Sequence, residues 1–343
     1  RADGPYRSTV AGQSYQFTQF EAIAARRMFP GFDEPVFKTP YDISVITRVD
    51  NTVVGNAPVA REEAAGEGLK RVVLARTAPL PSYLIKVAVG PFDGVAPPPV
   101  PPNRVRRQAL PLRAIATRGK APRLQYALDN TPRILAFLED YFDREYPYAK
   151  LDLIASPEFG TNAMENAGAI VYGDQRILLD ASSSLEQQRG FGVIHAHEIS
   201  HHWFGNLVTP KWWDDIWLNE SFANWMGNKA ANAWRPELQL DVLPCSSTAA
   251  SPRGASASRW TATCRSAAPS TPSPTSRAVA CCRCSRATSA RKLSAPASAG
   301  ICAAFPTASP MSRTSWPRWP RARGAPTWCR RSAASSTSPA CRW

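Results

Sequence analysis

Two histidines four positions apart constrain the fold of this chain more than any other feature. They lie in His197-Glu198-x-x-His201, and eighteen residues separate His201 from Glu220. On a helix, positions i and i+4 lie one turn apart on the same face, so both imidazoles can reach one ion. Glu220 would be the third ligand and leave a fourth position open, as catalytic zinc requires. Glu198 would then take a proton from water at the metal. The pattern predicts a hydrolytic site that binds one Zn2+ per chain.

The composition of the chain changes abruptly near Leu243. No Asp or Glu occurs after Asp241, and all 8 cysteines lie at or beyond Cys245. Of the 41 Lys and Arg residues, 15 follow Leu243, which leaves 26 basic against 27 acidic residues before it. The net charge of +14 therefore comes from the last hundred residues, and the first 243 have the composition of a nearly neutral globular protein.

The tail, residues 244–343, allows three interpretations. Its arginines and tryptophans could form a basic arm for nucleic acid or an anionic membrane. Its Ala, Ser and Pro content also suits a disordered linker. We favour a third interpretation, translation out of frame after about Leu243, because acidic residues vanish while Cys and Trp appear inside a helix-like segment. On that interpretation the cysteines predict no disulfide framework, and no nucleic-acid partner is expected.

Residues 1–118 are expected to form a β-rich domain whose beginning is missing. Alternating or β-branched segments predict strands over 15–20, 41–49, 80–90 and 110–117. The proline run 97–102 predicts a stiff, extended surface segment. No stretch of the sequence is apolar over the length that a transmembrane helix needs.

Residues 119–243 are expected to form the catalytic domain, with its end missing. Apolar residues at helical spacing predict a helix over 124–142, and strands are expected at 150–155 and 169–172 around the loop 159–168. The metal-binding helix should run from Leu185 to about Asn206, before Pro210, and a second helix should carry Glu220 through Lys229. The fold class is therefore α+β and multidomain, followed by a disordered or non-native tail.

Three motifs in order closely resemble the aminopeptidase N family of zinc metallopeptidases. They are His-Glu-Ile-Ser-His at 197–201 with Glu220, Asn-Ala-Met-Glu-Asn at 162–166, and Thr-Gln-Phe-Glu at 18–21. The resemblance covers roughly residues 13–240. It implies a thermolysin-like catalytic domain after the β-rich domain, peptide substrates with a free N-terminus, and Glu198 as the general base. It further implies that Glu165 and Glu21 bind the substrate's α-amino group, while the backbone near Ala163 and Met164 lines the peptide.

The sequence also departs from the pattern of that family. Asn162 replaces the usual glycine and His202 the usual glutamine, and no tyrosine follows Tyr172, although the family has a catalytic tyrosine after the glutamate ligand. We therefore expect impaired activity, and a catalytically inactive zinc-binding protein on the same fold is the alternative. A periplasmic or secreted location is favoured over the cytoplasm.

Four further side chains near the motif have more than one interpretation. His195 and His202 flank the ligands but face other directions on a helix, which predicts packing roles or contacts with ligands rather than metal binding. Asp214 and Asp215 could orient a metal-bound histidine or place negative charge at a helix N-terminus.

Overall fold

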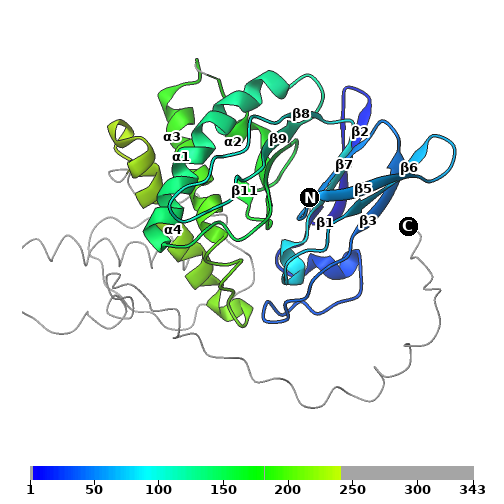
Figure 1. Cartoon of the computed structure of the whole chain (residues 1–343), viewed down its shortest axis with the longest axis horizontal. Coiled ribbons are helices and arrows are strands. Elements are labelled where there is room, and N and C mark those ends of the chain that lie inside the picture. The colour runs from blue at the N-terminus through cyan, green and yellow to red at the C-terminus, as the bar shows by residue number, and fades with distance from the viewer. Residues whose placement is uncertain (1–2, 181, 241–343) are drawn as a thin grey trace, which may run out of the picture. The chain divides into compact units, whose positions relative to one another are not determined.

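The structure, a computed structural model, describes residues 3–180 and 182–240 (Figure 1). The predictions for the tail 244–343 lie outside the described residues. The strands are β1 (Gly4–Val10), β2 (Gln13–Gln19), β3 (Ser44–Arg48), β4 (Thr52–Gly55), β5 (Val59–Ala64), β6 (Leu69–Leu74), β7 (Val87–Gly90), β8 (Asp93–Val95), β9 (Leu112–Ala116), β10 (Leu151–Ser156), β11 (Ala163–Met164) and β12 (Ala169–Gly173). The helices are α1 (Gln125–Phe142), α2 (Asp174–Ile177), α3 (Leu185–His201) and α4 (Ile216–Trp234).

The N-terminal region is β-rich, as predicted, and contains two antiparallel sheets. One has the strand order β1-β2-β7-β4 and the other the order β3-β6-β5. Ala11 and Gly12, both with positive φ (48° and 75°), join β1 to β2. A two-residue turn with φ > 0 at both positions matches the right-handed twist of the paired strands. At the edge of the second sheet, every residue of β5 is exposed.

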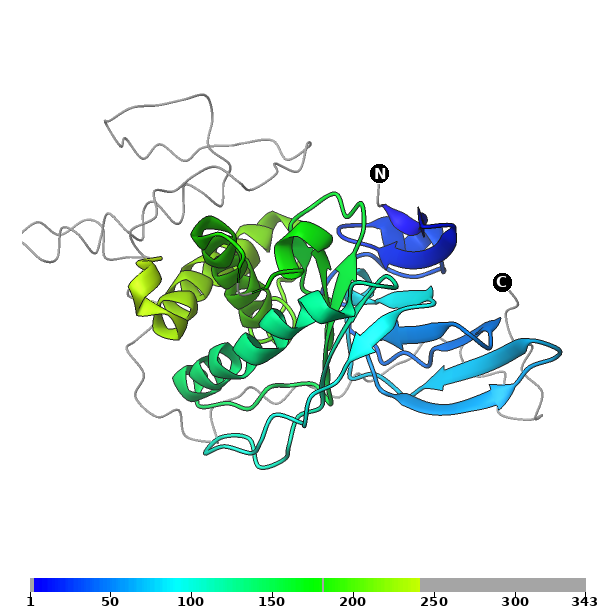
Figure 2. The ribbon, with the colours of Figure 1, turned by 90° about the horizontal axis from the view of Figure 1, so that it is seen from above.

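A five-stranded sheet with the order β11-β12-β10-β9-β8 supports the catalytic region. Its central strands β9, β10 and β12 are parallel, and every residue of β10 and β12 is buried. Side chains alternate between two cores: Leu153 packs in the core that the helices cover, and Ile154 in the core of the N-terminal region. The sheet therefore lies between the helices and the β-rich region (Figure 2). It includes β8 and β9, which precede the predicted domain boundary at residue 118.

Helices α1, α3 and α4 lie where the sequence predicts helices, whereas the short α2 was not predicted. The buried face of α1 includes Leu128, Ile134, Leu135 and Leu138, which recur at helical spacing. A capping box of Ser184 and Gln187 begins α3. In α4, the buried residues are mostly small, including Ala223, Gly227, Ala230 and Ala231, so the helix can approach α3 closely.

Two predicted boundaries and one predicted surface segment differ from the structure. Helix α3 ends at His201 and not near Asn206, because residues 202–208 form a tight turn in which Gly205 has φ +119°. The strand predicted over 80–90 begins only at Val87, since Ser82–Leu84 is a turn of 3-10 helix after Pro81. The proline run is not wholly superficial, because Val100 within it is 7% exposed and pairs with Leu110.

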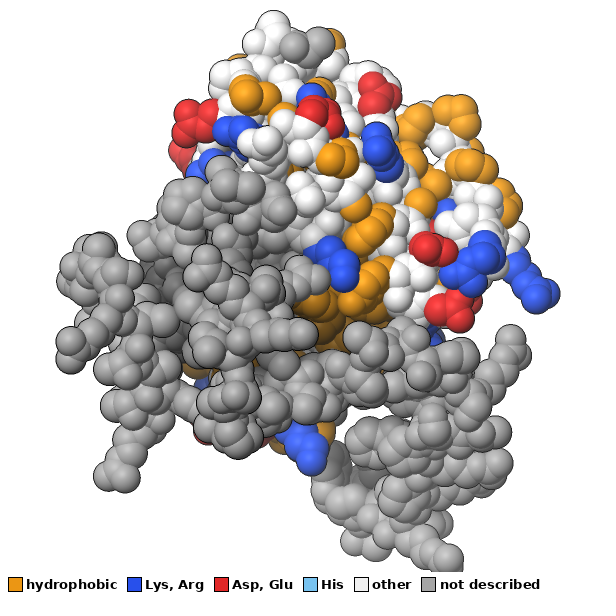
Figure 3. Space-filling view, turned by 90° about the vertical axis from the view of Figure 1, so that its left-hand side faces the viewer, with side chains coloured by type: hydrophobic (Ala, Val, Ile, Leu, Met, Phe, Trp, Pro, Cys, Tyr) orange, Lys and Arg blue, Asp and Glu red, His pale blue; other side chains and the backbone are white. Residues whose placement is uncertain are grey.

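Apolar side chains reach the surface on the helical side of the fold (Figure 3). Tyr141 of α1 and Leu218 of α4 are among those that are exposed, and the Lys229 ammonium lies 4.4 Å from the centre of the Tyr141 ring. Among the described residues, no helix combines the length and the apolar character that crossing a membrane requires.

Candidate metal centre and active site

The two predicted histidine ligands face each other on α3. The Nε2 atoms of His197 and His201 are 2.8 Å apart, and the side chain of His201 is buried. The predicted helix therefore brings both imidazoles to one point, as the spacing of four residues requires.

Glu220 reaches the same point from α4. Its carboxylate oxygens lie 3.5 Å from Nε2 of His197 and 3.9 Å from Nε2 of His201. Close packing of the two helices sets these distances. Gly227 lies two turns after Glu220, and a Cβ at Gly227 would come within 2.8 Å of the backbone N and Cα of His197. A glycine at this position lets the helices approach within ligand-binding distance.

Asn219 and Phe204, which the sequence motifs did not identify, fix the orientation of the His201 ring. Its Nδ1 lies 3.0 Å from Oδ1 of Asn219 and 3.1 Å from the carbonyl oxygen of Phe204, so Nδ1 carries the proton and donates. Nε2 is then left with a lone pair that points toward His197 and Glu220. The Asn219 amide also donates to Oε1 of Glu220 and Oε1 of Glu165, at 3.2 Å each. One asparagine thus contacts three of the predicted site residues.

The residues present fit a divalent metal ion. A tetrahedral zinc with bonds of about 2.0–2.1 Å holds two nitrogen ligands about 3.3 Å apart, and the separations in this site lie around that value. The two imidazole Nε2 atoms, 2.8 Å apart, are close enough for one cation to contact both. Burial raises the pKa of Glu220, but His197 and His201 outweigh it and lower the pKa to about 2, so this ligand is ionised. Two histidines and one glutamate are a donor set of catalytic zinc.

Glu198 lies directly beside the ligand group. Ligand atoms of Glu198, His201 and Glu165 all lie within 4.8 Å of one another. Glu198 is buried, and its Oε2 has no hydrogen-bond partner in the described part of the chain. Burial raises the pKa of Glu198 well above its usual value, and the charges of Glu165, Glu220 and Glu21 raise it further. Both effects favour the protonated form of this carboxyl group.

Glu165 and Glu21 place two further carboxylates beside the ligand group. Carboxylate oxygens of Glu21, Glu165 and Glu220 lie within 4.8 Å of one another, although Glu21 comes from the segment after β2 and Glu165 from the segment after β11. Burial raises the pKa of Glu21, and the charges of Glu165 and Glu220 raise it further. A protonated amine placed here would relieve this repulsion through charge-assisted hydrogen bonds.

Ala163 and Met164 form the short strand β11 at the edge of the five-stranded sheet. They pair with Tyr172 and Val171 of β12 on one side only. In the part of the chain that the structure describes, no strand pairs with the opposite side of β11.

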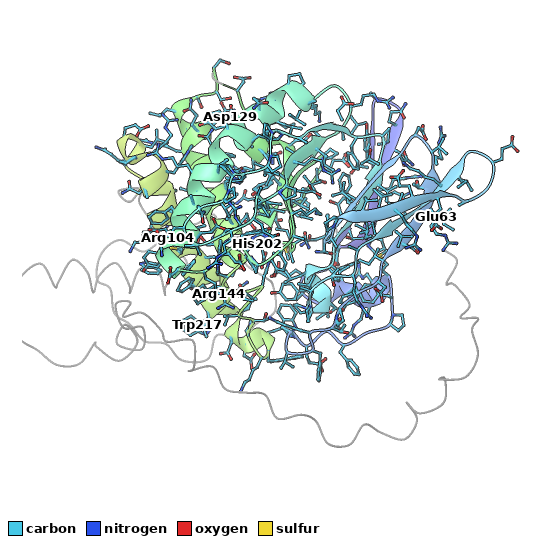
Figure 4. The ribbon with its side chains drawn as sticks, viewed as in Figure 1. Glu63, Arg104, Asp129, Arg144, His202 and Trp217 are labelled. Atoms are coloured by element: carbon cyan, nitrogen blue, oxygen red, sulfur yellow. The ribbon has the colours of Figure 1, made fainter. Side chains whose placement is uncertain are left out.

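His195 and His202 pack in the interior, as predicted. His195 lies between the hydroxyls of Tyr172 (2.7 Å) and Thr131 (2.9 Å), and burial lowers its pKa to about 3. His202, at the centre of the described fold in Figure 4, has Nδ1 3.2 Å from the carbonyl oxygen of Glu198. Its Nε2 accepts a hydrogen bond from the backbone N–H of Gly168, and burial lowers its pKa to about 3.

Asp214 and Asp215 are exposed in the 3-10 turn that precedes α4. The hydrogen bonds recorded for His201 Nδ1 go to Asn219 and Phe204, so the groups that orient this ligand are not these carboxylates. Of the two interpretations, the position favours negative charge at the N-terminus of α4.

Comparison with known proteins agrees with this arrangement of regions. Residues 3–84 match the peptidase M1 N-terminal domain, and residues 126–262 match the peptidase family M1 domain. Aminopeptidase M1-C of Oryza sativa subsp. japonica is 38% identical over 224 residues, which are 65% of this chain and 25% of that protein. Glutamyl aminopeptidase of Rattus norvegicus is 39% identical over 254 residues, 70% of this chain and 26% of that protein. Probable aminopeptidase 2 of Sulfurisphaera tokodaii is 38% identical over 214 residues, 62% of this chain and 26% of that protein. The chain thus spans about a quarter of the length of the curated relatives it matches.

Proposed function

The chain belongs to the M1 family of peptidases, and from this premise we propose that it is a zinc-dependent aminopeptidase that releases residues from the N-terminus of peptides. His197, His201 and Glu220 would hold one zinc ion on a thermolysin-like pair of helices. When bound, the ion would polarise the scissile carbonyl and lower the pKa of water toward about 7.

The proximity of Glu21 and Glu165 to the ligand Glu220 carries the proposal. Their carboxylates lie within 4.8 Å of one another, so a substrate ammonium held by Glu21 and Glu165 lies next to the metal ligands. Such an arrangement selects a substrate whose positive charge lies close to the scissile bond, as the α-amino group of a chain end does. The backbone of Ala163 and Met164 would pair with the substrate along the side of β11 opposite β12.

Glu198 would move the proton. Its carboxylate takes a proton from the attacking water and passes it to the nitrogen of the leaving amine, and its raised pKa suits a group that must hold this proton between the two steps. No tyrosine follows Tyr172 in this sequence, so none of its residues matches the tyrosine that the resemblance assigns to the oxyanion. We therefore propose that turnover by this chain is slow.

The test uses the full 343-residue chain loaded with zinc. Metal content is measured by atomic absorption, and release of 4-nitroaniline is followed from leucine 4-nitroanilide and from its N-acetylated form. We expect one zinc per chain and release from the free-amine substrate only. Glu198→Gln should keep the zinc and lose roughly 100- to 10,000-fold in rate, the usual contribution of a general base.

Each failure has a separate meaning. Bound zinc without any release would support the alternative, an inactive zinc-binding protein. Equal cleavage of the acetylated substrate would exclude amine recognition by Glu21 and Glu165. Loss of zinc from Glu198→Gln in parallel with activity would exclude its role as the base.

A further inference from the structure

The segment Glu165–Gly168 is anchored on the side of the helices by two residues. Asn206 donates from Nδ2 to the carbonyl oxygen of Glu165 at 2.8 Å. His202 accepts a hydrogen bond from the backbone N–H of Gly168 at 3.4 Å. These contacts attach both ends of the segment to the turn that follows α3.

On its other side, the segment is attached to the β-rich region by Asn56, the residue after β4. Nδ2 of Asn56 donates to the carbonyl oxygens of Ala167 and Leu84, both at 2.9 Å, and its Oδ1 accepts from the backbone N–H of Lys86 at 2.8 Å. Asn56 is 6% exposed. All three hydrogen bonds are buried, so the amide has one orientation and no water competes for it.

The backbone around Asn56 also touches the segment directly. Gly168 has φ +68°, and a Cβ on it would come within 2.6 Å of the carbonyl oxygen of Asn56. The Lys150 ammonium, which is buried, donates to the carbonyl oxygens of Gly55 (2.7 Å) and Gly168 (2.8 Å). Residues 55 and 56 therefore contact the segment through a side-chain amide, a shared lysine and close backbone packing.

We propose that Asn56 is a positioning residue for recognition of the substrate amine, acting through Ala167 on Glu165. This inference rests on the proposed function, in which Glu165 binds that amine. Ala167 is two residues after Glu165, and both are buried. Loss of the hydrogen bond to Ala167 would leave Lys150 and the Asn166 amide, which donates to the Leu84 carbonyl oxygen at 3.2 Å, as the remaining side-chain links between the segment and the β-rich region. The segment would then be held less tightly, and the separation between the Glu165 and Glu21 carboxylates would vary more. The metal ligands are on α3 and α4. The three hydrogen bonds of the Asn56 side chain go to Leu84, Lys86 and Ala167, which lie on neither helix.

The test separates amine recognition from metal binding by using two hydroxamates. Leucine hydroxamate carries a free amine beside a zinc-binding group, and N-acetyl-leucine hydroxamate carries the same group without the charge. Affinities for the zinc-loaded full chain are measured by calorimetry, together with zinc content. In Asn56→Ala we expect the preference for the free amine to fall about three- to tenfold, the factor that one or two hydrogen bonds produce. Affinity for the acetylated probe and the zinc content should not change.

Asn51→Ala is the matched control. Asn51 lies just before β4 and donates to the Thr47 hydroxyl at 2.9 Å, a single side-chain hydrogen bond remote in sequence from the Glu165 segment. This control should preserve both affinities. If Asn56→Ala does not fold, Asn56→Asp replaces it, because the carboxylate keeps the acceptor for the Lys86 N–H and loses the donor to Ala167.

The outcomes distinguish the two proposals. An unchanged preference for the free amine in a zinc-loaded Asn56 variant would overturn the positioning role alone. An equal loss of affinity for both probes would also overturn it, since the residue would then act only on general stability. No preference for the free amine in the unmodified chain would overturn amine recognition itself, and the positioning role with it.

Discussion

Replacement of Gly227 by alanine should separate the two ligand-bearing helices. Alanine normally stabilises a helix interior relative to glycine by about 0.5–1 kcal/mol. At Gly227, however, the new Cβ would lie 2.8 Å from the backbone N and Cα of His197 and 3.1 Å from its Cβ. Ordinary contact begins near 3.4 Å, so α4 would have to move by about 0.6 Å or more, and overpacking of this kind costs about 1–3 kcal/mol.

Gly190 offers a matched control within α3, because a Cβ there would meet nothing within 4 Å. Gly190→Ala should keep the full gain in helix stability, and Gly227→Ala should be less stable than Gly190→Ala by about 1–3 kcal/mol. At about 2–4 °C per kcal/mol for a domain of this size, their melting temperatures should differ by roughly 2–12 °C.

Metal affinity gives the second measurement. Glu220 lies seven residues before Gly227 on the same helix, so it moves with α4, and a shift of about 0.6 Å exceeds the tolerance of roughly 0.2 Å for metal–ligand distances. Competition with a chelating dye should show zinc affinity reduced about 10- to 100-fold in Gly227→Ala and unchanged in Gly190→Ala. Equal melting temperatures and equal zinc affinities for the two variants would refute the idea that contact at Gly227 sets the distance between the ligands.

Two predictions concern buried charges. Lys86 is wholly buried, donates to the Thr18 carbonyl oxygen at 2.5 Å, and has its pKa lowered by burial to about 7. The pKa of an unfolded lysine is near about 10.4. Between about pH 7 and about pH 10.4 the unfolded state therefore binds more protons than the folded state, and the free energy of unfolding rises with pH. In urea titrations, the free energy of unfolding of the unmodified chain should rise by about 2 kcal/mol between pH 7 and 9, and that of Lys86→Met should not. The same dependence of the free energy of unfolding on pH in both proteins would contradict this. Glu139→Gln, which leaves the buried Arg106 without its ionic partner at 2.9 Å, should lower the free energy of unfolding by about 3–5 kcal/mol. Asp140→Asn, at the next and exposed position, should have a far smaller effect in the same titration, and similar losses for both would argue against the buried pair.

The features that could be predicted from the sequence are those encoded by local spacing. His197 and His201 face each other because a helix repeats every 3.6 residues, and that relation holds wherever the helix packs. The same reasoning predicted α1 from its apolar positions and the start of α3 near Leu185.

The features that could not be predicted depend on contacts between distant segments. Asn56 and Ala167 are 111 residues apart, and asparagine carries no periodic pattern that would identify its partner. Asn219 precedes a predicted ligand, yet its contacts with His201 and Glu165 require the packing of α4 on α3. The predicted end of α3 is too late because Pro210 is the helix breaker that the sequence shows. The earlier turn at Gly205 depends on packing against Asn219 of α4, since a Cβ at Gly205 would lie 1.9 Å from Oδ1 of Asn219.

The edge strand β5 has a consequence for the behaviour of the chain in concentrated solution. Its outer backbone groups could pair with a strand from another molecule, which is the usual route to aggregation through sheets. Its side chains include Arg61, Glu62 and Glu63, with Arg61 paired to Glu63 and Glu62 paired to Lys70, and Figure 4 shows Glu63 at the periphery. A second copy added here would have to cover these charges and remove their water. The charged side chains of β5 thus oppose growth of the sheet from one molecule to the next.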